Sequence, residues 1–391
     1  MTSSRRVIGR ARPLWLCLGL ASVFAASARA QDAAVARDDS DRPSEVTDSA
    51  GHVYFFNKGR DFGTDAYAGP FDVILNKGFA VAQWQGRDRE IFSFPYGWSA
   101  VWASITRPGK AMEQAGGWGN VLKRHLVPFV GDDQVREAQW VPNYFGHLIE
   151  GGMAYRRQLE WNRLHEVPFS TLSAVLVTQF AVILNEAYET PAGDPFVDKN
   201  GTAGLFVDAV IMDPLGILLF HHDGVSRFFS EKLGATIWPR QASLTFPGPR
   251  VVNNGEAVVF RPKLWFTDSF RFFVRTGIGA QFGISVPRDD GLEVGVGVGA
   301  ESYSRQLDSA GVESAEFALS TGLWIDRDGS LLFSLTWEEK TDRSLAIDVF
   351  PGVISIAGTT VGAWFQFDRD YNPYFGITGR RTMGLGIGAG F

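Results

Sequence analysis

Cysteine is almost absent from this sequence, because Cys17 is the one cysteine among 391 residues. A disulfide within the chain is therefore excluded, and stability must come from packing. An excess of basic charge is missing too: 37 Lys and Arg stand against 43 Asp and Glu, for a formal net charge of −6. Phosphate binding needs clustered Lys and Arg, so we exclude nucleic acid as a partner.

Motifs for catalysis are also scarce. The sequence contains no Gly-x-Ser-x-Gly elbow, and its glycine-rich run at 295–299 lies within an alternating segment with no following helix, which disfavours phosphate binding. The run His221-His222-Asp223-Gly224 is typical of a turn at a helix end. We therefore predict no cofactor and no metal, and we favour a non-enzymatic role over an enzymatic one.

The N-terminal region has the pattern of an export signal. A basic start is followed by an apolar run at 14–26 and by the small-x-small ending Ala28-Arg29-Ala30. This pattern predicts a signal peptide at 1–30 that is cleaved and directs export, which places Cys17 outside the mature chain. Residues 31–50 are polar and acidic and predict a disordered linker.

Residues 51–240 predict a mainly helical module. Short strands are expected at 53–56 and 79–84, and the helical period predicts further elements at 97–106, 118–127, 141–165, 169–189, 203–220 and 224–233. The stretches 171–184 and 204–220 are apolar around most of the helix, so they must be enclosed. Both are shorter than the roughly 20 residues that cross a bilayer, which favours buried core helices over transmembrane ones.

Two helices carry acidic or His pairs at an i, i+3 spacing, His147 with Glu150 and Glu186 with Glu189, which places each pair on one helix face. The candidate site residues are His147, Glu150, Glu186, Glu189, Asp208 and Asp213. Facing pairs of this kind are able to bind a divalent metal, as in carboxylate-bridged helical bundles. A buried polar network, in which carboxylates pair with Arg156 or Arg157, is the favoured interpretation because the ordered Glu-x-x-His repeat is missing.

After residue 249 the period of the sequence changes to two. Apolar residues alternate with small or charged ones over 271–282, 292–301 and 315–326, and similar segments follow to the C-terminus. Nine such segments can be counted, whereas a closed bacterial barrel needs an even number. We therefore expect eight strands if 372–391 is one long bent strand, or ten if 242–246 supplies another. Segments of about ten residues with aromatic ends favour a transmembrane barrel over a soluble sandwich. Its many inward glycines predict space for a plug or a ligand.

The last residues resemble the insertion signal of bacterial outer-membrane barrels, which ends on a strand with alternating apolar residues and a final Phe. The residues that carry this resemblance are Leu385, Ile387, Ala389 and Phe391. It implies recognition by the outer-membrane barrel assembly machinery. The stretch 143–189, the segment 208–216 and the strand block together resemble an uncharacterised domain-of-unknown-function family of Gram-negative outer-membrane proteins. This resemblance implies an envelope location and does not assign an activity.

These observations predict an α+β protein, with a helical module followed by an antiparallel transmembrane β-barrel of eight to ten strands at 241–391. We expect an outer-membrane protein with a structural role or a role in binding lipid or a partner. The partner can be a second copy of the chain, which would form a homo-oligomer. Two alternatives stay open. One is an outer-membrane lipid-modifying enzyme that uses the helical carboxylates and His147, and the other is a diffusion pore.

Overall fold

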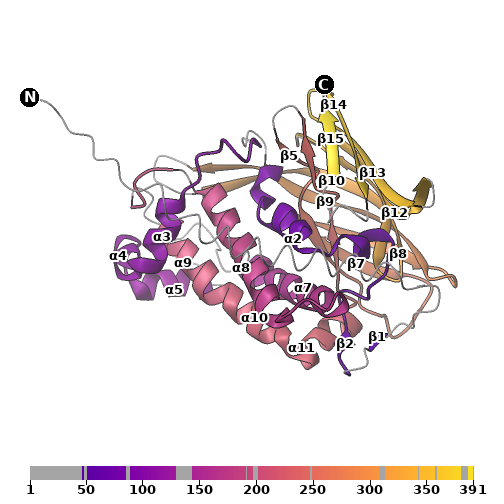
Figure 1. Cartoon of the computed structure of the whole chain (residues 1–391), viewed down its shortest axis with the longest axis horizontal. Helices are drawn as coiled ribbons and strands as arrows, with labels where there is room; N and C mark the ends of the chain where they lie inside the picture. The colour runs from indigo at the N-terminus through magenta and orange to yellow at the C-terminus, as the bar shows by residue number, and fades with distance from the viewer. Residues whose placement is uncertain are drawn as a thin grey trace, which may run out of the picture.

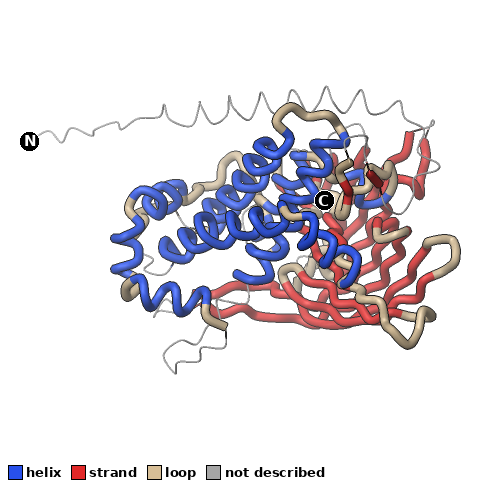
Figure 2. The backbone as a smooth tube through the Cα atoms, turned by 90° about the horizontal axis from the view of Figure 1, so that it is seen from below, coloured by secondary structure: helices blue, strands red, loops and turns tan. Residues whose placement is uncertain are grey.

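The computed structural model describes residues 46–47, 51–84, 89–128, 143–190, 192–196, 201–246, 249–307, 313–341, 343–356, 359–379 and 386–390. Most of the predicted signal peptide and linker, together with Leu385 and Phe391, lies outside this range. The described part is an α+β fold, in which a helical layer packs against a large sheet (Figure 1). Figure 2 shows the helices gathered on one side of the molecule and the strands on the other.

The helical layer contains both the predicted helices and additional ones. Its elements are η1 (Gly63–Tyr67), α2 (Pro70–Lys77), η2 (Ala80–Gln83), α3 (Trp98–Thr106), α4 (Pro108–Gln114), α5 (Trp118–Leu126), η3 (Asn143–Gly151), α7 (Gly152–Leu164), α8 (Ser170–Glu189), α9 (Gly201–Phe206), η4 (Val207–Met212), α10 (Asp213–His221), α11 (Asp223–Arg227) and η5 (Phe228–Lys232). The six helical predictions are confirmed. The strand expected at 79–84 is wrong, because η2 occupies that stretch as a short 3₁₀ helix.

The strands form two sheets in the described part of the chain. The smaller pairs β1 (Val46–Thr47), which lies within the predicted linker, with β2 (Val53–Tyr54). The larger has 13 strands in the order β3-β6-β7-β8-β9-β10-β11-β12-β13-β14-β15-β4-β5, and only the β15–β4 pair is parallel. Its members are β3 (Thr236–Pro239), β4 (Ser243–Thr245), β5 (Val251–Val252), β6 (Glu256–Phe260), β7 (Arg271–Thr276), β8 (Gly279–Pro287), β9 (Leu292–Leu307), β10 (Glu313–Arg327), β11 (Ser330–Glu338), β12 (Leu345–Ile356), β13 (Thr359–Phe367), β14 (Pro373–Gly379) and β15 (Gly386–Gly390).

The predicted closed barrel of eight to ten strands is wrong in both closure and number. The sheet curves, but among the described residues its two edge strands, β3 and β5, do not pair with each other. The helical layer covers these edges instead: Ile237 of β3 packs in a buried cluster with Phe220, and Val251 of β5 packs in another with Val177. An exposed edge presents unpaired backbone groups, and covering it with helices removes that liability.

The number of strands was underestimated for two reasons. Strands β3 and β5 have four and two residues, too few to show a period of two, whereas β4 lies within 242–246, where the ten-strand alternative places a strand. The predicted strand 271–282 is two strands, β7 and β8, joined by a tight connection at Gly277 and Ile278. Those two residues continue the alternation of small and apolar side chains, so the turn has no polar signal.

The two faces of the sheet differ sharply in chemistry. On what we call the outer face, cross-strand register aligns apolar side chains in a row from β8 to β15. The row is Ile284, Val296, Leu323, Leu335, Ile347, Phe365, Phe375 and Ala389. The opposite, inner face meets the helical layer, where Tyr67 of η1 packs in a buried cluster with Trp324 and Phe350. The helical segments thus fill the concave side of the sheet.

Inward glycines provide the space for that filling. A Cβ at Gly362 would lie 2.5 Å from the Tyr67 hydroxyl, and a Cβ at Gly376 would lie 2.5 Å from the Trp364 ring. Real Cβ atoms do not approach other atoms so closely, so these positions require glycine. The expected space inside the sheet is therefore occupied by the protein's own side chains at these points.

Candidate functional site in the helical layer

His147 lies at the centre of a group of carboxylates contributed by three helical segments. Its Nδ1 is 3.2 Å from Asp213 Oδ2, and its Nε2 is 3.9 Å from Asp208 Oδ2. One ligand atom each from His147, Glu186 and Asp208 lie within 4.8 Å of one another. The structure thus brings together four of the six predicted site residues, which we call the His147 cluster.

Two of the four side chains in the His147 cluster lie on π-helical turns. His147 belongs to η3, and Asp208 belongs to η4, which leads directly into α10. Pro214 has no backbone N–H for the carbonyl of Val210, one turn earlier, so regular α-helical bonding is interrupted where η4 lies. Wider turns of this type occur frequently at functional sites, because they redirect side chains without ending the helix.

Close contact between two helix backbones sets the distance across the cluster. A Cβ at Gly152 would lie 2.7 Å from the Gly216 carbonyl oxygen, and a Cβ at Gly216 would lie 2.5 Å from the Leu148 carbonyl oxygen. The segment η3–α7 therefore crosses α10 at a separation that only glycine permits. This crossing brings His147 within reach of Asp213.

Electrostatics favours a charged imidazole in this surrounding. Burial alone would lower the pKa of His147, but the carboxylates of Asp208 and Asp213, with Glu186 beyond them, outweigh it and raise the pKa to about 10. Burial raises the pKa of Asp208 to about 6, although His147 opposes that shift.

Glu150 joins a second group of charges beside the cluster. Lys77, the last residue of α2, has its Nζ 3.7 Å from Glu150 Oε1 and 3.7 Å from Glu256 Oε1. Burial raises the pKa of Glu150 to about 7, and Lys77 moderates that rise. Glu256 begins β6, so this group connects the helical layer to the sheet.

The remaining predicted residues occupy other positions. Glu189 is the last residue of α8 and is not among the three whose ligand atoms gather at His147. The prediction that carboxylates pair with Arg156 is confirmed for Glu160, whose Oε1 accepts a hydrogen bond from Arg156 Nε at 2.8 Å. It is wrong for Glu150, Asp208 and Asp213, which face Lys77 or His147 instead. Arg157 donates to the backbone oxygen of Thr64, so the arginines serve a separate group from the His147 cluster.

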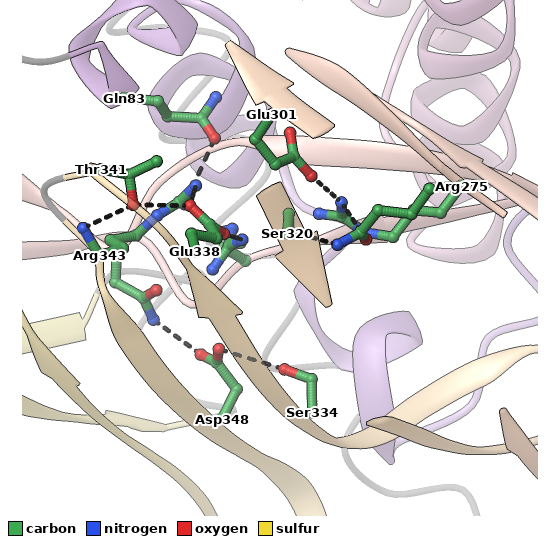
Figure 3. A network of polar contacts seen from close by, with 12 residues as sticks. Gln83, Arg275, Glu301, Ser320, Ser334, Glu338, Thr341, Arg343 and Asp348 are labelled. Carbon is green, nitrogen blue, oxygen red and sulfur yellow. Dashed lines mark hydrogen bonds and ion pairs between the residues drawn. The ribbon is translucent and has the colours of Figure 1, made fainter. Parts of the chain in front are cut away.

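A second polar network lies on the inner face of the sheet (Figure 3). Arg275 NH1 donates to Glu301 Oε1 at 2.6 Å, and Arg343 NH2 lies 3.4 Å from Glu338 Oε2. A further pair joins Arg261 to Asp326 at 2.7 Å. Each of these six side chains is at least nine-tenths buried. The inner face therefore holds ion pairs where a soluble sheet would have an apolar core.

Sequence reasoning missed Lys77, Glu256 and the cross-strand ion pairs as members of these networks. Lys77 ends a helix whose other buried residues include Val73 and Leu75, so it gave the signal of an ordinary basic helix end. The alternation of Glu293 and Glu301 with apolar residues did place them on one face. Their arginine partners lie on other strands, at distances that no local pattern reveals.

No protein-family model, curated protein or solved structure matches the chain.

Proposed function

We propose that this protein is an outer-membrane protein whose curved sheet presents its outer face to lipid and holds the helical layer in a structural role or a role in binding lipid or a partner. The exposure of the outer face is the observation that carries the proposal. Its exposed large apolar side chains include Phe272, Phe282, Ile284, Val286, Val296, Val298, Phe317, Leu319, Trp337, Phe375, Ile377 and Ile387. Complete burial of a fully exposed side chain of this size contributes about 1.5–3 kcal/mol, and these side chains, roughly half exposed, would each gain about half of that in lipid.

An aqueous sandwich accounts poorly for this surface. In a soluble sandwich a second sheet covers the apolar face, whereas here the described helices lie on the opposite, inner face. The apolar row crosses every strand from β8 to β15, and soluble monomers rarely expose large contiguous apolar patches. A lipid bilayer covers such a surface without a second protein layer.

The inner face favours an anchor over a diffusion pore. Ion pairs such as Arg275–Glu301 are buried, and Tyr67 enters the concave side of the sheet. A wet channel requires polar side chains that line open space, whereas these side chains contact one another. The helical layer then occupies the concave side of the sheet and covers its two edges.

The helical layer offers further apolar surface. Ser170–Glu189 and Thr202–His221 are long and apolar enough to cross a membrane by length and composition alone, and 44% of the apolar window of each is buried. Both are therefore only partly enclosed. Leu172 and Leu218 are more than half exposed, as is Trp102 of α3. This surface supports contact with lipid or with a second copy, in line with the partners expected from the sequence.

Single-cysteine labelling tests the lipid contact. With Cys17→Ser as the background, Ile284→Cys and Ile377→Cys would place an environment-sensitive fluorophore on the outer face, and Asp290→Cys would place it in the exposed turn before β9. The protein is reconstituted in vesicles that contain nitroxide-labelled acyl chains. We expect strong quenching and a blue-shifted emission at positions 284 and 377, and neither at 290.

Two results would contradict the proposal. One is a labelled protein that stays monomeric in buffer and does not associate with vesicles. The other is equal quenching at all three positions, or none at 284 and 377 after reconstitution, which would mean that protein rather than lipid covers the outer face.

A further inference from the structure

The His147 cluster has the arrangement of ligands that a metal ion requires, and this inference stands apart from the proposed membrane role. One imidazole nitrogen and carboxylate oxygens from α8 and η4 converge within 4.8 Å. Tetrahedral bonds of about 2.0–2.2 Å place two ligands of one ion about 3.5 Å apart, so binding requires the ligand atoms to approach by roughly 1 Å at most.

Asp213 takes the place of an outer-shell partner. Histidines that bind metals usually donate their second ring N–H to a carboxylate, which fixes the tautomer and the ring orientation. His147 Nδ1 faces Asp213 Oδ2 at 3.2 Å, so its Nε2 is left to face Asp208 at 3.9 Å, beyond hydrogen-bonding distance. The imidazole is thus held by one acid and directed at another.

Two buried oxygen atoms provide an independent observation. Oδ1 of Asp208 and Oδ1 of Asp213 are buried and have no hydrogen-bond partner among the residues that the structure describes. The Asp213 side chain is only 3% exposed, and its Oδ1 packs so closely on Gly151 that a Cβ at that glycine would lie 2.8 Å from it. A buried carboxylate oxygen without a partner is costly, and a cation bound by Asp208 removes that cost for the Asp208 carboxylate.

We propose that His147 Nε2, Asp208 and Glu186 bind one divalent transition-metal cation, with Asp213 as the residue that positions His147. A mixed nitrogen and oxygen set suits Zn²⁺, Mn²⁺ or Fe²⁺, whereas Ca²⁺ prefers oxygen ligands alone. A cation can enter from solvent, because the side chains of His147 and Asp208 are 22% and 15% exposed. Binding replaces the Nε2 proton of His147 with the cation and leaves the Nδ1 proton on the bond to Asp213.

The test is metal binding to the purified full chain in detergent after treatment with a chelator. Zn²⁺ and Mn²⁺ are titrated by calorimetry, and bound Mn²⁺ is followed by electron paramagnetic resonance. We expect one ion per chain, with affinity reduced at least 100-fold in His147→Ala and Asp208→Asn. We expect a reduction of about 10- to 100-fold in Asp213→Asn, as for other outer-shell partners.

Matched controls separate this site from adventitious binding. His222→Ala and Glu231→Gln remove exposed side chains of the same types from neighbouring helical segments, and both should leave the affinity unchanged. If His147→Ala fails to fold, Asp208→Asn, which keeps the side-chain shape, decides the question. The proposal is overturned if the wild-type chain binds neither ion, if the folded cluster variants bind as tightly as wild type, or if Ca²⁺ binds as tightly as Zn²⁺.

Discussion

Glu160 is the residue whose replacement should affect the stability of the helical layer most clearly. Its carboxylate is fully buried and accepts backbone N–H bonds from Phe55 at 2.9 Å, Phe56 at 2.7 Å and Asn57 at 2.8 Å. The fourth donor is Arg156 Nε at 2.8 Å. One side chain therefore fixes the segment after β2 to α7.

The Glu160→Gln substitution keeps the shape and removes the charge. The amide oxygen still accepts from some of these donors, but the amide NH₂ faces donors and leaves them unsatisfied, with Arg156 short of its buried partner. Breaking a buried pair on one side costs about 3–5 kcal/mol, and hydrogen bonds to charged groups contribute about 1.5–3 kcal/mol each without adding fully. We expect a loss of about 3–5 kcal/mol in the free energy of unfolding.

The chain provides a matched control at the same helical spacing. Arg227 and Glu231 also form an i, i+4 pair, but their side chains are 48% and 40% exposed. Glu231→Gln should cost less than about 0.5 kcal/mol. Denaturant unfolding in detergent, followed by tryptophan fluorescence, measures both variants. A loss below about 1 kcal/mol for Glu160→Gln, or equal losses for the two variants, would refute the reasoning.

Three further predictions concern other parts of the molecule. Gly362→Val should cost at least about 2 kcal/mol, because its side chain would collide with Tyr67, and thermal unfolding should show the loss. Burial lowers the pKa of His125 to about 4 in the folded chain, so as the pH falls the unfolded chain binds a proton at this histidine before the folded chain does. The free energy of unfolding should therefore fall by up to about 3 kcal/mol between pH 6.5 and pH 4. His125→Gln should flatten that part of the stability–pH curve. Ile284→Lys should reduce insertion into vesicles by about 2–4 kcal/mol, in proportion to its depth, while a Lys at Asp290 in the same assay should have little effect.

The sequence by itself determined that a helical region precedes a block of strands, and it determined the type of the longer elements. Its helical period located α3, α5 and α8 within two residues of their ends, and its period of two placed the residues of β9 and β10 on alternate faces. Local patterns carry this information because side-chain direction follows from spacing along a helix or strand. The acidic and His pairs were also visible as candidates.

Tertiary structure decided whether those candidates meet and how the sheet ends. His147 and Asp213 are 66 residues apart, and they come into contact because Gly152 and Gly216 let two helices touch. Strand pairing at the edge was equally non-local: β15 pairs in parallel with β4, and helices rather than a final strand pair cover the open edges. Contacts between distant segments depend on close packing of whole surfaces, and spacing along one segment does not specify that packing.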